Sequence, residues 1–354
     1  MSGRRRTLVV SGTLLAGLVL VAALLPVPYV IFRPGPLTDV LGEGEGGEPI
    51  ITAEGAQTYP TDGSLSITTV GVTPAGARMD LLAALQAWLD PEKAVVPRDV
   101  VYPGNPSTEQ AREENAAVFA GSQQLAAVAA LRHLGYDVPE QADQVVVQQV
   151  LDGAPAEGVL EAGDVIVAAA GEGVLVPDDV VTRVSAAEPG AAVPVTVLRD
   201  GELLDLQVPT KASEADPQKA AIGVVVSPSW DLPVDVSIDV PGEIGGSSAG
   251  LVFTLGVIDR LTPGALLGGA SVAGTGEIRP DGTVGPISGI QQKIAGARAE
   301  GKRLFLAPAD NCGSVVGAAP GDMVVTPVST VDDAVAAIEA FTAGEADSLP
   351  RCEA

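Results

Sequence analysis

Residues 245–261 read GGSSAGLVFTLGVIDRL, a glycine-rich turn followed by an apolar run of helical length. The pattern predicts a helix that begins near residue 250, with Ser248 at its amino-terminal end. Backbone N–H groups at a helix N-terminus lack partners, and the helix dipole favours negative charge there. The position therefore suits a nucleophile and the oxyanion that its attack creates. On this segment alone, an ordinary N-cap serine is the better explanation.

The same turn matches G-x-S-x-G through Gly246, Ser248 and Gly250, the pattern of an α/β-hydrolase nucleophile elbow. The histidine content argues against that class. The chain has one histidine, His133, and it precedes Ser248, whereas an α/β-hydrolase needs its histidine after the nucleophile. A chymotrypsin-like order stays open, but His133 falls near the end of an expected helix, where capping is the simpler role. If Ser248 is a nucleophile, we expect a base of another residue type.

Lysine is the usual substitute for histidine in such hydrolases. Lys293 lies in a helical pattern, GIQQKIAGARAE at residues 289–300. Its neighbours at helical spacing are small or apolar, which points the side chain toward the inward face. Burial lowers the pKa of a lysine, and only the neutral amine can take a proton from Ser248. Periodicity alone favours a snorkelling surface lysine equally.

From about residue 234 to 335 the chain resembles the proteolytic domain of Lon proteases, the Ser–Lys peptidase family S16. The matching stretches are GSSAG at 246–250, VAGTGEI at 272–278, GTVGPISGIQQKIAGAR at 282–298 and FLAP at 305–308. The resemblance implies that Ser248 is the nucleophile and Lys293 the base. It also implies that the Thr275 hydroxyl hydrogen-bonds the lysine amine. No cofactor or metal is expected.

Two departures from the Lon pattern matter. Lon proteins often carry Asp-Gly-Pro before Ser-Ala-Gly, and the corresponding residues here are Gly245, Gly246 and Ser247. An acidic contribution to the site is lost unless Glu243 supplies it. The chain also has no G-x-x-x-x-G-K-[ST] phosphate loop. We therefore expect no ATP-driven unfolding, and substrates that are peptides, flexible tails or already unfolded chains.

Residues 145–166 contain VVVQQV, GAPAEGVL and EAGDVI, and a hairpin is expected around Asp200-Gly201. This region resembles a PDZ module of the kind found in bacterial proteases. Such modules bind an extended peptide by adding it as a strand to a sheet edge. No carboxylate-binding loop is evident from the sequence, so the ligand stays open. A small β-rich spacer is the plainer alternative.

Arg4, Arg5 and Arg6 precede an uncharged run at residues 7–32. Crossing a bilayer needs roughly 20 apolar residues. We expect residues 7–32 to anchor the chain in the cell membrane once, with the N-terminus cytoplasmic and the rest extracytoplasmic. A signal peptide cleaved after Leu25 is the alternative.

The chain has two cysteines, Cys312 and Cys352. Outside the cytoplasm they could form a disulfide that ties the C-terminal tail to the body. Two unrelated thiols are the alternative.

We therefore expect an α+β multidomain fold with an N-terminal transmembrane helix, a PDZ module and a C-terminal α+β domain like the Lon proteolytic domain. The expected divisions are a basic tip and anchor at 1–35, a mixed α/β region at 36–118, a PDZ-like module at 119–212, a Lon-type domain at 220–342 and a tail at 343–354. Together they resemble the YlbL-like PDZ–Lon membrane proteases. The expected function is that of an ATP-independent serine endopeptidase. The alternative is a catalytically inactive PDZ-based binding or scaffold protein at the cell surface.

The formal net charge of -25 argues against nucleic acid as a partner, because the phosphate backbone would be repelled. Polypeptide substrates, bound in part through the PDZ module, are the expected partners. A homo-oligomer is a possible state.

Overall fold

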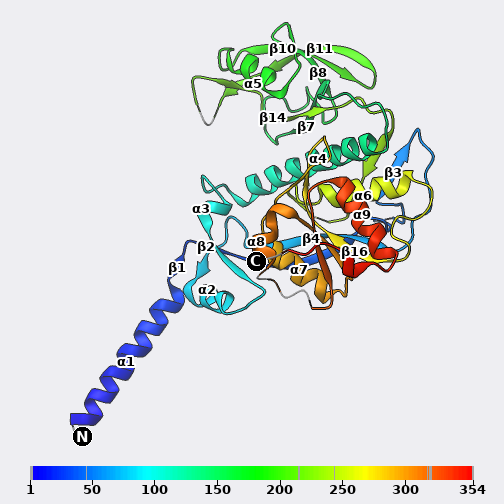
Figure 1. The fold of residues 1–354 in the computed structure, drawn as a ribbon. Coiled ribbons are helices and arrows are strands. Elements are labelled where there is room, and N and C mark those ends of the chain that lie inside the picture. Colours follow the sequence, from blue (N-terminus) through cyan, green and yellow to red (C-terminus); the bar gives the residue numbers. More distant parts are fainter. Residues whose placement is uncertain are drawn as a thin grey trace.

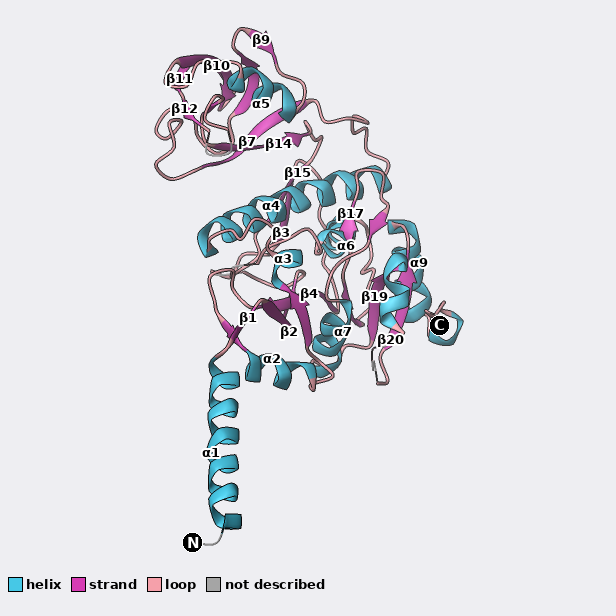
Figure 2. Cartoon of the chain, turned by 90° about the vertical axis from the view of Figure 1, so that its left-hand side faces the viewer, coloured by secondary structure: helices cyan, strands magenta, loops and turns pink. Residues whose placement is uncertain are grey.

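The computed structural model describes residues 3–44, 46–213, 216–242, 244–316, 318 and 321–352, without the side chains of residues 4–6 and 18–24. The chain forms two folded units (Figure 1). The helix α1 (Gly3–Leu24) projects from the larger unit, and the smaller unit lies at the opposite end of the molecule in both views (Figure 2).

The larger unit is built on a six-stranded sheet in the order β20-β19-β16-β4-β2-β6. The neighbours β20, β19, β16 and β4 pair in parallel, while β2 runs antiparallel to both of its neighbours, β4 and β6. The strands are β2 (Tyr29–Asp39), β4 (Ser64–Val72), β6 (Ala94–Pro97), β16 (Ser271–Gly274), β19 (Leu304–Pro308) and β20 (Val324–Val328).

Helices cover both faces of this sheet. Along each inner strand, alternate side chains enter different cores, as the period of two in a strand requires. Val272 packs into one core with helices α4 (Thr108–His133), α6 (Gly250–Leu261) and α9 (Val331–Thr342). Its neighbour Ala273 packs into the other, beside α7 (Ile290–Ala299) and α8 (Cys312–Val315). Burial on both faces explains why β19 (LFLAP) carries no polar side chain.

Short elements complete the larger unit. Three two-stranded pairs join β1 (Pro26–Val27) to β5 (Met79–Asp80), β3 (Ile51–Glu54) to β15 (Asp235–Ile238), and β17 (Glu277–Ile278) to β18 (Val284–Gly285). The remaining helices are α2 (Leu81–Trp88), α3 (Arg98–Val101) and the 3-10 turns Ala309–Asn311 and Ala346–Ser348. The disulfide between Cys312 and Cys352 is present, so the predicted link between tail and body is confirmed.

The smaller unit is an antiparallel sheet in the order β11-β10-β8-β7-β14 with its own apolar core. Its helix α5 (Pro177–Ser185) packs against β13 and β14. The strands are β7 (Gln144–Val150), β8 (Val165–Ala169), β9 (Glu172–Gly173), β10 (Ala192–Arg199), β11 (Glu202–Pro209), β12 (Lys211–Ala212), β13 (Ala220–Ala221) and β14 (Val224–Ser229).

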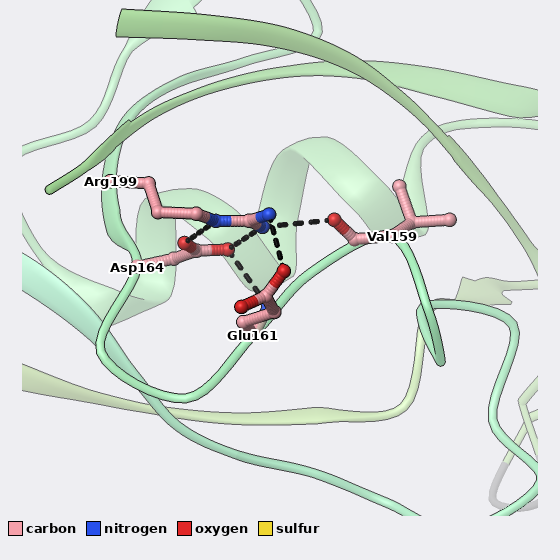
Figure 3. A network of polar contacts seen from close by, with 4 residues as sticks. All are labelled: Val159, Glu161, Asp164 and Arg199. Carbon is pink, nitrogen blue, oxygen red and sulfur yellow. Dashed lines mark hydrogen bonds and ion pairs between the residues drawn. The ribbon is translucent and has the colours of Figure 1, made fainter. Parts of the chain in front are cut away.

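A buried ion pair explains the Gly-Asp-Val-Ile motif of this unit (Figure 3). The side chain of Asp164 is buried, and its two oxygens accept hydrogen bonds of 2.7 and 2.8 Å from Arg199 at the end of β10. Arg199 also donates to Glu161 and to the carbonyl of Val159. Burial alone would raise the pKa of Asp164, but the hydrogen bonds from Arg199 and the Glu161 amide lower it below its usual value.

The expected domain boundaries need two corrections. Residues 36–118 are not a separate region, because β4 pairs with both β2 and β16 in the sheet of the larger unit. The smaller unit does not begin at 119, because α4 packs in the core of the larger unit, and it extends past 212 to include β14. Pairing between strands far apart in sequence leaves no mark in local composition, so the local sequence does not reveal that strands on both sides of the PDZ-like unit share one sheet.

The expected anchor at residues 7–32 is also revised. The helix ends at Leu24, and β1 and the first residues of β2 already belong to the larger unit. Within the part of the chain whose side chains are described, we find no helix that is both long and apolar enough to span a bilayer.

Candidate active site

Ser248 lies in the turn that leads into α6. Gly246 in this turn has a φ of +88°, a conformation that glycine adopts at little cost. Gly250 packs so closely on Ile278 that an added Cβ would lie 2.7 Å from its Cγ2 atom. The carbonyl of Ser248 accepts hydrogen bonds from the Gly276 amide at 2.8 Å and the Thr275 hydroxyl at 2.9 Å. These hydrogen bonds tie the Ser248 turn to residues 275–276 and so fix the backbone that carries the Ser248 hydroxyl.

Lys293 approaches Ser248 from the other side, in the first turn of α7. Gly289 precedes this helix with a φ of +71°, and a Cβ there would lie 2.8 Å from the Val70 side chain. Glycine thus lets α7 start directly against β4, which brings Lys293 into the interior, where it is 3% exposed. Its Nζ atom lies 2.6 Å from the Ser248 Oγ, 2.9 Å from the Thr275 Oγ1 and 2.8 Å from the Thr68 carbonyl.

The three sequence-predicted residues therefore meet. Thr275 is fully buried between the other two, donating its hydroxyl proton to the Ser248 carbonyl and accepting from Lys293. Burial lowers the pKa of Lys293 from 10.5 to about 7, because the charged ammonium loses hydration. No carboxylate takes part in the hydrogen bonds of its Nζ atom, which are made to two hydroxyls and one carbonyl of the described residues.

The Ser248 hydroxyl opens into a cleft of about 650 Å³. One wall is the stretch of β4 at residues 67–72, and the opposite wall is the loop at residues 241–242 and 244–247. β16 accompanies β4 only as far as Ile67. Within the described chain no strand pairs with residues 69–72 on that side, so an unpaired strand edge runs along the cleft beside Ser248.

Three contributors to the site were not predicted. The Thr68 carbonyl is supplied by β4, which lies far from the motifs in sequence. The backbone carbonyl of Asn115 in α4 accepts a hydrogen bond from the Gly246 amide, and Asn115 also lines the cleft. Glu277 accepts a hydrogen bond from the Ser247 hydroxyl at the cleft. Glu277 belongs to the Thr-Gly-Glu motif, so its neighbourhood was a usable signal for an acidic side chain here. Glu243 lies outside the described residues.

His133 is engaged elsewhere. Its Nδ1 atom lies 2.7 Å from the Asp332 Oδ1 atom, at the junction of α4 with α9. It is not among the residues that line the described cleft. The arrangement therefore offers a serine–lysine pair and no serine–histidine pair.

Comparisons with known proteins agree with both units. Residues 225–339 match the Lon protease (S16) C-terminal proteolytic domain, and residues 133–210 match the PDZ domain family. The Lon protease of Phenylobacterium zucineum (strain HLK1) is 34% identical over 114 residues, which are 31% of this chain and 14% of that protein. The chain thus spans a small part of the relative that it matches. The Lon proteolytic domain supports serine peptidase activity.

Two similar solved structures each cover about a quarter of this chain. The PDZ domain of an SdrC-like protein from Listeria innocua is 21% identical, with 24% of this chain and 93% of that chain covered and a TM-score of 0.22. A solution structure of a protein from Geobacillus thermodenitrificans is 32% identical, with 25% and 100% covered and a TM-score of 0.22. At such TM-scores neither structure informs the arrangement of the whole chain.

Proposed function

We propose that this protein is a serine endopeptidase in which Lys293 is the general base and Ser248 the nucleophile. The observation that carries the proposal is a buried amine 2.6 Å from a hydroxyl that opens into a cleft. With a pKa of about 7, about half of the lysine is neutral at pH 7 and can accept a proton.

The hydrogen bonds around Lys293 favour this direction of proton transfer. A neutral amine has two N–H donors and one lone pair. The Thr68 carbonyl cannot donate, and the Thr275 hydroxyl already donates to Ser248, so these two groups accept the two N–H bonds. The lone pair is then left for the Ser248 hydroxyl. Thr275 acts as a positioning residue, because it joins the lysine amine to the serine backbone.

The reaction that follows is acyl transfer in two steps. The Ser248 Oγ bonds to the carbonyl carbon of a peptide while its proton passes to the Lys293 Nζ. The C–N bond breaks, and the proton goes to the leaving amine. Water then attacks the ester, loses a proton to the lysine and releases the acid, which restores Ser248.

The shape of the cleft favours a polypeptide substrate. Residues 69–72 of β4 offer main-chain donors and acceptors along an unpaired edge. An extended peptide can add to such an edge as a strand, which brings one of its carbonyls near Ser248 without a fixed sequence. A folded substrate cannot present such a strand, so flexible or unfolded segments are the proposed substrates, without ATP.

The PDZ unit is the proposed capture site. β14 is an edge strand of its sheet, and α5 packs against it, which leaves a second strand edge for a peptide. Tethered capture raises the local concentration of the scissile segment.

The two ends of the PDZ unit meet, because the Asp143 amide donates to the Ser229 carbonyl at 3.1 Å. Residues 144–228 can therefore be replaced by a short Gly-Ser linker. Cleavage of a protein substrate should then slow far more than cleavage of a short peptide. An unchanged ratio of the two rates would reject the capture role.

We further propose that the chain is a membrane-anchored protease of the YlbL-like type, with its folded units outside the cytoplasm. The basic cluster at residues 4–6 and the apolar sequence of α1 support this topology. A disulfide suits an oxidising compartment. Protease added to intact cells should digest the region after residue 33. Protection of that region from the protease would show that the proposed orientation is wrong. A mature protein that begins after Leu25 would show that the N-terminal segment is a cleaved signal peptide and not an anchor.

The serine–lysine assignment is tested by an active-site serine probe and a fluorogenic peptide. Wild type should be labelled, while Ser248→Ala should lose labelling and Lys293→Met should lose turnover. The double variant should be no worse than either single variant, because the residues act as a unit. His133→Ala is the matched control and should keep turnover. Failure of the wild type to react would favour the inactive scaffold, and a large loss in His133→Ala would revive a histidine mechanism.

A further inference from the structure

The short helix α2 exposes a continuous apolar face. Trp88 is 74% exposed and Leu89, which follows it, is 76% exposed. Leu85 and Leu82 are about half exposed and lie about one and two turns before Trp88, so the four side chains share one side of the helix. The small residues Ala84 and Ala87 form the buried side. Burying four large apolar side chains would be favourable, yet no described part of the chain covers this face.

This face lies at the foot of α1. The Leu81 amide donates to the Leu25 carbonyl at 3.2 Å, which joins the start of α2 to the residue that follows α1. The pairing of β1 with β5 holds the same two segments together. Figure 2 shows α2 beside the base of α1, on the side of the larger unit that faces away from the PDZ unit. Leu25 is itself half exposed, so the apolar surface continues from α2 to α1.

We propose that the exposed face of α2 lies in the interface of a lipid bilayer and forms a second membrane contact beside α1. This inference rests on the membrane anchoring in the proposed function. Continuity with α1 argues for lipid as the occupant, since the described side chains of α1 at Leu14 and Leu15 are also exposed and apolar. Any membrane that receives α1 meets α2 at its surface.

The composition of α2 fits the interfacial region. Residues 81–89 read LLAALQAWL and carry no charge, so attraction to anionic lipid is not needed. Tryptophan is enriched at membrane–water interfaces, where its ring is apolar and its N–H can meet headgroups or water. The polar groups at the helix start are satisfied, because the Asp80 carboxylate accepts the Ala83 amide at 2.7 Å. Two contacts instead of one would fix how the larger unit is oriented on the membrane.

Trp88 provides the test, because the chain has two tryptophans and the other, Trp230, is buried in the core of the larger unit. The full chain is reconstituted into phosphatidylcholine vesicles, with or without bromine on the acyl chains near the headgroup. Bromine quenches tryptophan on contact. We expect a blue-shifted emission and strong quenching of one component, and we expect Trp88→Phe to remove that component while Trp230 stays unquenched.

A matched control places the exposed tryptophan on the PDZ unit instead of on α2. Leu203 is an exposed apolar residue on β11 of the PDZ unit, distant from α1 (Figure 1). Leu203→Trp in the Trp88→Phe background should float with the vesicles and show no quenching. Co-flotation separates the two ideas. A chain that floats while Trp88 stays unquenched overturns the interfacial role of α2 and leaves the anchor intact. A chain that does not float overturns both. If the Trp88 emission is blue-shifted without bromine quenching and the chain dimerises, the apolar face of α2 binds a second copy of the chain and not lipid. Labelling by the serine probe reports on the peptidase assignment independently of these outcomes.

Discussion

Replacing Lys293 by methionine should remove activity and make the fold more stable at neutral pH. The pKa of this lysine falls from 10.5 to about 7 on folding, so at pH 7 burial of the amine costs about 4 kcal/mol by linkage. Methionine fills the space without that cost. It leaves the Thr68 carbonyl without the amine, which costs about 1–3 kcal/mol, while the Thr275 hydroxyl keeps its hydrogen bond to the Ser248 carbonyl. The net expectation is a gain of about 1–3 kcal/mol at pH 7.

The pH dependence gives the sharper signature. Between pH 7 and 10 the unfolded chain still holds the lysine proton, whereas the folded chain has released it. Because the unfolded state binds more protons, wild-type stability rises with pH, by up to about 1.4 kcal/mol per pH unit. Near pH 10 the cost of burying the amine falls below about 1 kcal/mol. The advantage of Lys293→Met should therefore vanish or reverse there.

The assay is equilibrium urea unfolding of the full chain in detergent, at pH 7, 8.5 and 10, followed by the fluorescence of the buried Trp230. Lys93→Met is the control, because Lys93 makes a surface ion pair of 2.9 Å with Asp90. Such a pair contributes about 0–1 kcal/mol. If Lys293→Met were less stable than wild type by the same amount at every pH, burial would not neutralise the lysine. The assignment of Lys293 as the base would then lose its physical basis.

Other perturbations address the site and the two units. The kcat/KM of the wild type should rise about tenfold per pH unit below the lysine pKa of about 7 and level off above it; a flat profile from acid to alkaline pH would contradict a lysine base. Thr275→Val should lower kcat about tenfold to a hundredfold with little change in KM, because it removes one acceptor of the amine. Loss of the disulfide in Cys312→Ser/Cys352→Ser should cost about 2–4 kcal/mol in thermal unfolding, and equal melting with and without reductant would show that the bridge contributes nothing. Arg199→Met leaves the buried carboxylate of Asp164 unpaired and should destabilise the PDZ unit by about 3–5 kcal/mol, while the serine probe still labels the larger unit.

Much of the candidate site could be predicted from local sequence. Ser248 stands before an apolar helical run, and the small neighbours of Lys293 fit an inward-facing lysine as well as a surface one. The resemblance to Lon proteolytic domains, carried by motifs in the same order, then implied that Ser248, Lys293 and Thr275 form one set. Each of these signals lies within one short segment, because helix starts, glycine turns and inward faces are set by neighbouring residues.

The tertiary structure decided what these segments share. Helical spacing could not distinguish a surface lysine from a buried one. Only the close approach of α7 to β4 surrounds the Lys293 amine and lowers its pKa. The Thr68 carbonyl that binds this amine belongs to β4, which precedes the PDZ unit in the sequence, whereas Lys293 follows it.

The domain division failed for the same reason. The sequence predicted the two kinds of unit and, through the resemblance to Lon proteolytic domains, the Ser–Lys–Thr set, because the motifs that carry these predictions lie in short segments. It favoured a disulfide between the two cysteines but left two separate thiols open. It did not determine that β2, β4 and β6 complete the sheet of the C-terminal motifs, or that β14 belongs to the PDZ sheet. Strand pairing joins backbone groups that every residue carries, so the partners of a strand are chosen by the packing of the whole fold and not by the strand's own letters.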